Sequence, residues 1–129
     1  MLIAVYGTLK TGEENYARFL SGRTPSFRGF VEIPYRMYAN GAYPMLVPAE
    51  GRSRVFVEVF EVEEGKMQEL DALEEPYDYW RETIYIREWG CDVEIYVHRA
   101  PPSEGFAPVS SGNWKFRSRD SRDARESRG

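Results

Sequence analysis

The chain has 129 residues, of which 42% are hydrophobic and 15% aromatic, enough for one packed domain and too few for two. No apolar run approaches the roughly 18 residues that a membrane span requires, and the apolar N-terminus lacks the basic flank of a secretory signal. The single cysteine, Cys91, excludes a disulfide within the chain and favours a reducing compartment. We therefore expect a soluble cytoplasmic protein without a membrane partner.

The charges are divided unevenly between the body of the chain and its C-terminus. Residues 115–129 hold six of the 17 basic residues and three of the 21 acidic ones, a net charge of +3. Residues 1–114 keep 11 basic and 18 acidic residues, a net charge of −7. An acidic body repels nucleic acid, so only the tail is expected to attract phosphate. We interpret 1–114 as the folded domain and the Ser/Arg/Asp-rich 115–129 as a charged, disordered tail, solvated rather than bound to RNA.

The N-terminal third predicts a strand, a glycine turn and a helix. Residues 2–6 form a near-continuous apolar run, which is typical of a strand buried on both faces, and Gly7 ends it. Residues 11–14 have the pattern of a capping box, with threonine at the N-cap and glutamate three residues later. This pattern predicts a short helix that begins at Gly12 and ends at 21–22.

The remaining elements are expected from alternation and from turn residues. Strands or strand pairs are predicted at 27–47, 55–62, 83–87 and 93–97, and a helix at 66–75. Asn40 and Gly41 are typical of a two-residue hairpin turn because both tolerate positive φ, and Pro76 ends the helix. About six strands and two short helices predict an α+β fold, with a mixed, largely antiparallel sheet or small β-barrel and the helices beside it.

The helix predicted at 66–75 places one carboxylate among its apolar residues. At 100° per residue, Glu74 lies about 40° from Leu70, between that leucine and Met67. Such a carboxylate is costly unless it is used or paired. Desolvation and the negative end of the helix dipole both raise its pKa from about 4.3 toward neutrality, where a general acid and base works best. The alternative is that the last turn frays, or that Glu74 pairs with Arg81.

The turn after the first strand is a second candidate site. Gly7 lets the backbone turn, and the successive N–H groups from Gly7 to Lys10 are able to form an anion cradle. The dipole of a helix that begins at Gly12 would add positive potential nearby. The alternative is an ordinary strand exit with a solvated Lys10.

Other kinds of chemistry find less support in the sequence. Cys91 lies in a predicted hairpin turn and His98 at the end of the following strand, so nothing in the spacing brings them together as a nucleophile pair, and both are expected to be inert. One histidine and one cysteine do not make a zinc site of the usual composition. A phosphate loop of the Gly-x4-Gly-Lys-Ser/Thr type is absent. We expect neither a metal nor a cofactor.

Five segments, taken in order, resemble signatures of the γ-glutamylcyclotransferase-like family, including its AIG2-like branch. Tyr6-Gly7-Thr8-Leu9-Lys10 resembles the Tyr-Gly-Thr/Ser-Leu loop that follows the family's first strand. Leu70-Asp71-Ala72-Leu73-Glu74 resembles its Leu-Asp-x-Leu/Phe-Glu motif. The other three are Tyr38-Ala39-Asn40-Gly41-Ala42-Tyr43-Pro44, Pro76-x-x-Tyr79-x-Arg81 and Ser111-Gly112-Asn113-Trp114. The resemblance covers about residues 1–114 and implies the family's α+β fold.

The resemblance also implies a reaction, the cyclisation of a γ-glutamyl amine or amide to 5-oxoproline with release of the amine. Glu74 would be the general acid and base, and the glutamyl part would be bound by Tyr6, Gly7, Thr8, Leu9 and Lys10. Tyr79 and Arg81 would support the site, although an ion pair of Arg81 with Asp71 or Glu74 is an equal alternative. A non-catalytic module that binds a small molecule on the same fold is the alternative function.

Two positions depart from the family's pattern. Glu75 stands where the family usually has glycine, and its like charge would raise the pKa of Glu74 further. Asn113 stands where the family often has aspartate. Neither change removes a catalytic group, but both leave the substrate preference open, and the sequence names neither the leaving amine nor the oligomeric state.

Overall fold

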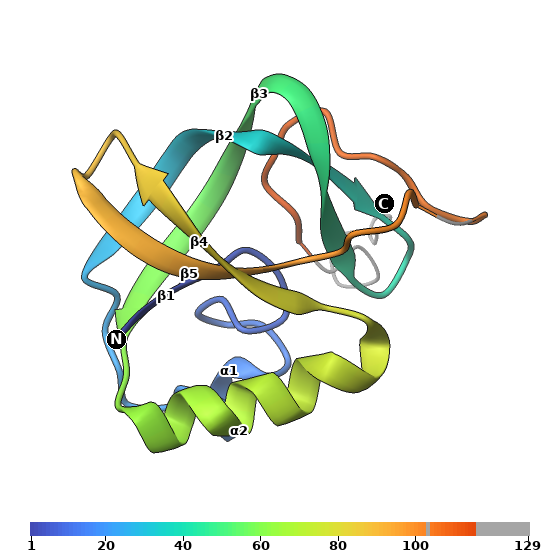
Figure 1. The fold of residues 1–129 in the computed structure, drawn as a ribbon. Coiled ribbons are helices and arrows are strands. Elements are labelled where there is room, and N and C mark those ends of the chain that lie inside the picture. Colours follow the sequence, from blue (N-terminus) through green and yellow to red (C-terminus); the bar gives the residue numbers. More distant parts are fainter. Residues whose placement is uncertain (103, 116–129) are drawn as a thin grey trace, which may run out of the picture.

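The computed structural model describes residues 1–102 and 104–115, so the predicted tail, apart from Lys115, lies outside the described residues. Figure 1 shows a curled sheet with two helices together on one side of it. The elements, in chain order, are β1 (Leu2–Val5), α1 (Tyr16–Phe19), β2 (Phe27–Ala39), β3 (Pro44–Glu61), α2 (Glu64–Glu74), the 3-10 helix η1 (Glu75–Tyr77), β4 (Trp80–Ile86), β5 (Cys91–Val97) and β6 (Ala107–Pro108). No helix in these described residues is long and apolar enough to cross a membrane.

The sheet confirms the predicted α+β architecture. Its strand order is β4-β5-β1-β3-β2-β6, and it curls into a half-barrel (Figure 1). β1 pairs parallel with β5, whereas the other neighbouring strands pair antiparallel, so the sheet is mixed and largely antiparallel. The predicted hairpin at 83–87 and 93–97 is formed by β4 and β5, which begin three and two residues earlier than expected.

The central strand β1 is buried on both faces, as its apolar run predicts. Ile3 and Val5 pack into the hydrophobic cluster that α2 covers, whereas Ala4 and Tyr6 belong to the cluster on the opposite face of the sheet. Neighbouring strands on both sides of β1 leave no edge for solvent. This central position carries the loop after Val5 to the end of α2, where the candidate site lies.

The hairpin of β2 and β3 contains two strands and a turn within 27–47, as expected, but β3 runs on to Glu61 and includes most of the separate strand expected at 55–62. The two strands pair over nearly their whole length, with one shift in register between Ile33 and Tyr35. Pro34 lies at this shift. A proline has no N–H to donate to the neighbouring strand, so regular pairing is interrupted there. The turn at Asn40 is longer than the predicted two residues, since Asn40 Oδ1 accepts hydrogen bonds from the backbone N–H of both Ala42 and Tyr43, at 2.7 and 2.8 Å.

The helix expected to begin at Gly12 is wrong in its extent, because α1 spans only Tyr16–Phe19. Thr11 does not cap it. Both its backbone N and its Oγ1 donate to Glu58 Oε1, each at 2.8 Å. Glu58 is 2% exposed, and this buried carboxylate takes the backbone N–H of Thr11 that a capping box would pair with Glu14. The second predicted helix is present as Glu64–Glu74, and Glu75 and Pro76 continue it as η1.

Candidate active site

Glu74 is the last residue of α2 and lies at the edge of a cavity of about 370 Å³. Leu70 and Met67, one and two turns earlier, are buried against the sheet, and Glu74 follows on the same face. The helical pattern therefore placed the carboxylate correctly. The cavity lies between the end of α2, the loop after β1 and the turn that joins β2 to β3.

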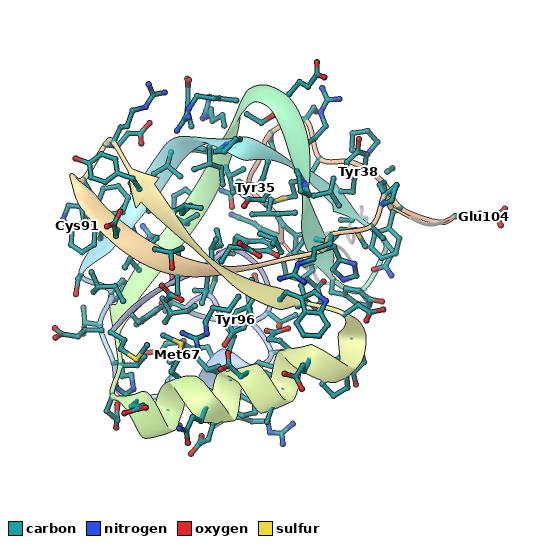
Figure 2. All side chains as sticks on the ribbon, viewed as in Figure 1. Tyr35, Tyr38, Met67, Cys91, Tyr96 and Glu104 are labelled. Carbon is teal, nitrogen blue, oxygen red and sulfur yellow. The ribbon has the colours of Figure 1, made fainter. Side chains whose placement is uncertain are left out.

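Tyrosine is the most frequent residue in the cavity wall. Its lining includes five tyrosines: Tyr6, Tyr43, Tyr77, Tyr79 and Tyr96. Figure 2 shows Tyr96 reaching from β5 into the space between the sheet and α2. Tyr77 lies on η1 and is 62% exposed, so it forms part of the rim, whereas Tyr79 is buried. A wall of this kind removes water from around the Glu74 carboxylate.

The loop after β1 forms the opposite wall. Gly7, Thr8 and Leu9 line the cavity, and within the described part of the chain their backbone N–H groups donate no hydrogen bond. The loop is held from behind, since Asn15 donates from its backbone N to Thr8 O at 2.8 Å and from Nδ2 to Thr8 Oγ1 at 3.0 Å. Three consecutive free donors are therefore available to an anionic or carbonyl oxygen.

Position 7 requires a glycine because the backbone there lies close to Pro44. The sharp turn that the sequence indicated is not the reason. The φ of Gly7 is not positive, so another residue would suit the backbone. A Cβ at this position would lie 2.8 Å from Pro44 Cγ and 2.9 Å from Pro44 Cδ, closer than packed carbon atoms approach. The absence of a side chain thus lets the turn between β2 and β3 close on the loop.

Lys10 is placed differently from the other four residues of the predicted cradle. Its backbone N donates to Gly7 O at 3.0 Å, which closes a turn, and Lys10 is not part of the cavity wall. The side chain is 4% exposed and turns away, with Nζ 3.0 Å from Asn113 Oδ1 and 2.5 Å from Trp114 O. Lys10 is therefore neither solvated nor positioned to touch a ligand, and it ties the loop to the C-terminal segment.

The Glu74 carboxylate has no counter-ion among residues 1–102 and 104–115. Among the residues described, it accepts no hydrogen bond and forms no ion pair. Burial alone raises its pKa from the ordinary 4.5 to about 7. Neither alternative reading of the sequence holds, because the last turn of α2 continues into η1 and Arg81 binds elsewhere. A carboxyl group with this pKa exchanges protons readily near neutral pH.

Three tyrosine hydroxyls near Glu74 each donate to another acceptor. Tyr6 donates to Tyr96 O at 2.6 Å, Tyr79 donates to Pro44 O, and Tyr96 donates to Asp71 Oδ1 at 2.7 Å. Burial raises the pKa of all three phenols, and the nearby Glu74 raises each further. The phenols therefore stay protonated and shape the cavity without stabilising the ionised carboxylate.

The two residues predicted to support the site have different positions. Tyr79 lines the cavity, and His98 packs edge-on against its ring with 4.4 Å between centroids. Arg81 is not in the cavity wall. It binds Asp71 through Nε and Nη2, at 3.0 and 3.1 Å, and Glu94 through Nη1, at 3.0 Å. Of the alternatives left open, the ion pair with Asp71 is the one that the structure contains.

Several cavity residues were missed by sequence reasoning. Tyr96 belongs to an ordinary alternating strand, and its role depends on the pairing that sets it opposite Arg81. Glu14 and Arg18 come from the segment expected to be an amphipathic helix, and both are exposed at the cavity. Tyr43 belongs to the segment 38–44, which resembles a family signature, but nothing in the sequence distinguished it from the other tyrosines.

Cys91 and His98 do not form a nucleophile pair, and neither lines the cavity. Cys91 and His98 lie at opposite ends of β5, about 20 Å apart along an extended strand. Within residues 1–102 and 104–115, no group of three or more His, Cys, Asp or Glu side chains is arranged to hold a metal ion.

Comparison with known proteins agrees with the fold and the motifs. A family profile described as "Gamma-glutamyl cyclotransferase, AIG2-like" matches residues 3–116. A Methanocaldococcus jannaschii protein named "Putative gamma-glutamylcyclotransferase" is 32% identical over 115 residues, which are 88% of this chain and 94% of that protein. The gamma-glutamylaminecyclotransferase of Bos taurus is 39% identical over 88 residues, 63% of this chain and 52% of that protein. The crystal structure of an AIG2-like protein from Mus musculus superimposes with a TM-score of 0.65 at 24% identity, covering 88% of this chain and 87% of that one. The chain belongs to the gamma-glutamyl cyclotransferase, AIG2-like family.

Proposed function

We propose that the protein cyclises a γ-glutamyl amine or amide to 5-oxoproline and releases the amine, with Glu74 as general acid and base. The observation that carries this proposal is the unpartnered Glu74 carboxylate, with a pKa of about 7, in a cavity whose opposite wall offers the free N–H groups of residues 7–9. Membership of the family supports the same reaction.

The reaction needs no protein nucleophile and no water. Glu74 takes a proton from the substrate's α-ammonium group, and the resulting amine attacks the γ-carbonyl carbon. The new C–N bond closes the five-membered ring as the bond to the leaving nitrogen breaks. Glu74 then returns this proton to the leaving nitrogen. The second proton, which the ring nitrogen loses as it becomes an amide, is also taken up by the released amine, so that the products are 5-oxoproline and an ammonium ion. The cavity brings the two ends of one substrate together, and this positioning lowers the barrier.

The raised pKa of Glu74 decides how well it performs the first step. Each pKa unit corresponds to about 1.4 kcal/mol, so a carboxylate at about 7 accepts the ammonium proton at a cost about 3 kcal/mol lower than one at 4.5. The same group, once protonated, remains acidic enough to protonate the leaving nitrogen. A carboxylate paired with arginine would be a much weaker base.

The cradle at Gly7, Thr8 and Leu9 would hold oxygen atoms of the substrate. Its three N–H groups suit either the α-carboxylate of the glutamyl part or the negative charge that develops on the γ-carbonyl oxygen. Glu14, Arg18 and Tyr77 also line the cavity, are exposed, and would face the leaving amine.

The test is release of 5-oxoproline from a panel of γ-glutamyl compounds whose leaving amines are alkylamines, α-amino acids or side-chain amines. We expect turnover of at least one compound, and we expect Glu74→Gln to lower kcat at least 1,000-fold while ligand binding is kept. Glu75→Gln is the matched control, because this neighbouring glutamate is exposed and should leave kcat within about twofold. If the native protein turned over no compound of the panel, the proposal would be contradicted. If it bound a compound without turnover, the protein would instead be a non-catalytic module that binds a small molecule.

A further inference from the structure

Asp71 lies on α2 one turn before Glu74 and accepts hydrogen bonds from both Arg81 and Tyr96. Arg81 reaches it from β4 with two hydrogen bonds, at 3.0 and 3.1 Å, and the Tyr96 hydroxyl reaches it from β5 at 2.7 Å. Residues three apart on a helix are neighbours on its surface, with about 5–6 Å between their Cβ atoms, so the donors bound at Asp71 lie next to the Glu74 position. The structure nevertheless leaves Glu74 without either donor.

The guanidinium of Arg81 is fixed on both sides. Its Nη1 binds Glu94 Oε1 at 3.0 Å, and the other oxygen of Glu94 accepts from Thr83 Oγ1 at 2.7 Å. Arg81 therefore makes a two-point contact with Asp71 and a third contact with Glu94, an arrangement that specifies its direction. The charge of Arg81 is therefore offset by the carboxylates of Asp71 and Glu94, and neither contact involves Glu74.

The remaining groups around Glu74 do not offset its charge. Tyr6, Tyr79 and Tyr96 face it from β1, the β4 side and β5, and their hydroxyls donate elsewhere. Glu75 follows it on the chain and is exposed. Glu14 and Arg18 line the same cavity from the α1 region, and within the described residues Arg18 forms no ion pair with Glu74.

We propose that Asp71 is a positioning residue that holds Arg81 and the Tyr96 hydroxyl away from Glu74, so that Glu74 keeps the proton affinity of a working base. Its catalytic consequence rests on the proposed cyclisation, but its effect on the Glu74 carboxyl does not. An arginine within about 4–6 Å lowers a carboxyl pKa by roughly one to three units, which would turn Glu74 into a permanently ionised, weak base. Asp71 acts through Arg81 and Tyr96 and touches no reacting atom.

The test is the titration of Glu74 by carbon-13 NMR on protein labelled at the glutamate side-chain carboxyls, with Glu74→Gln used to assign the signal. In Asp71→Asn we expect the Glu74 midpoint to fall by about one pH unit or more, because Arg81 loses the carboxylate that binds it at two points. In the double variant Asp71→Asn/Arg81→Gln the midpoint should return to within a few tenths of its native value. Failure of the double variant to restore the midpoint would overturn the proposal.

Two further variants separate this role from a general effect on packing. Glu94→Gln removes the other partner of Arg81 and should leave the Glu74 midpoint unchanged, since Asp71 still holds the guanidinium. Tyr96→Phe should also leave it within a few tenths, because the hydroxyl donates to Asp71; a rise of one pH unit would show that Tyr96 stabilises ionised Glu74 and would contradict the proposal. Because Tyr96→Phe keeps the Arg81–Asp71 pair, it tests the part of the proposal that concerns the Tyr96 hydroxyl even if Asp71→Asn does not fold.

The same variants have a kinetic signature if the cyclisation is correct. In Asp71→Asn the rising limb of kcat/KM against pH should move down with the NMR midpoint, and the plateau should fall at least tenfold because the base is weaker. The double variant should recover the native position of the limb. NMR midpoints that behave as expected in a protein without turnover would overturn the proposed reaction alone, whereas unmoved midpoints in an active enzyme would overturn the role of Asp71 alone.

Discussion

Lys10 Nζ donates a 3.0 Å hydrogen bond to Asn113 Oδ1, across a separation of 103 residues in the sequence. The contact joins the loop after β1 to the last described segment of the chain, and Lys10 also binds Trp114 O. Because Lys10 immediately follows the free amides of residues 7–9, the C-terminal segment supports the wall that faces Glu74. Burial lowers the pKa of Lys10, and the nearby carboxylates of Glu13 and Glu58 oppose that effect.

Asn113→Asp should strengthen this contact. A carboxylate opposite Lys10 Nζ makes a charge-assisted hydrogen bond, which is about twice as strong as one to a neutral amide. We expect the free energy of unfolding at pH 7 to rise by about 1 kcal/mol, measured by urea denaturation, and the gain to vanish below about pH 4 as the aspartate is protonated. Asn113→Ala is the companion variant and should lose about 1 kcal/mol. A less stable Asn113→Asp protein would mean that Lys10 is not charged in the folded state.

Gly7→Ala should disturb the cradle. The added Cβ would meet Pro44 at 2.8 Å, so the loop or the turn between β2 and β3 must move. We expect a loss of about 1–3 kcal/mol in the free energy of unfolding and a fall in kcat/KM of at least tenfold. Gly41→Ala is the matched control, because a Cβ there meets nothing within 4 Å and φ is not positive. Equal effects of the two substitutions would refute the close contact as the reason for Gly7.

Glu74 should make the stability of the protein depend on pH in a defined direction. Its pKa is raised in the folded state, to about 7 from 4.5, so the folded protein holds this proton more tightly than the unfolded chain. The resulting stability is fully present below about pH 4.5 and is lost as the pH rises through about 7. The loss amounts to at most about 3 kcal/mol by pH 9.

Glu74→Gln removes this term because the amide does not ionise. The variant should be as stable as the native protein at pH 5 and more stable at pH 9, as measured by urea denaturation at each pH. Glu75→Gln should not show this growing difference in stability between pH 5 and pH 9, since its side chain is exposed. A constant difference between the native protein and Glu74→Gln across this range would contradict the raised pKa.

Local patterns predicted the elements that carry the site. The apolar run of residues 2–6 indicated a strand buried on both faces, and β1 is such a strand because it lies between β3 and β5. The helical period put Glu74 beside Leu70 and Met67, and the three share the buried side of α2. The capping pattern at Thr11 failed because the buried carboxylate of Glu58, 47 residues away, takes both of its donors.

The sequence by itself determined that β1 is buried on both faces and which side of α2 is buried, and therefore that the carboxylate at position 74 points inward. Only the tertiary structure decided which donors stay away from that carboxylate. The sequence offered Asp71 and Glu74 as partners of Arg81, and strand pairing and register direct it to Asp71 and Glu94. Periodicity is a local property of the backbone, whereas the choice of a polar partner depends on strand order and side-chain direction across the whole fold.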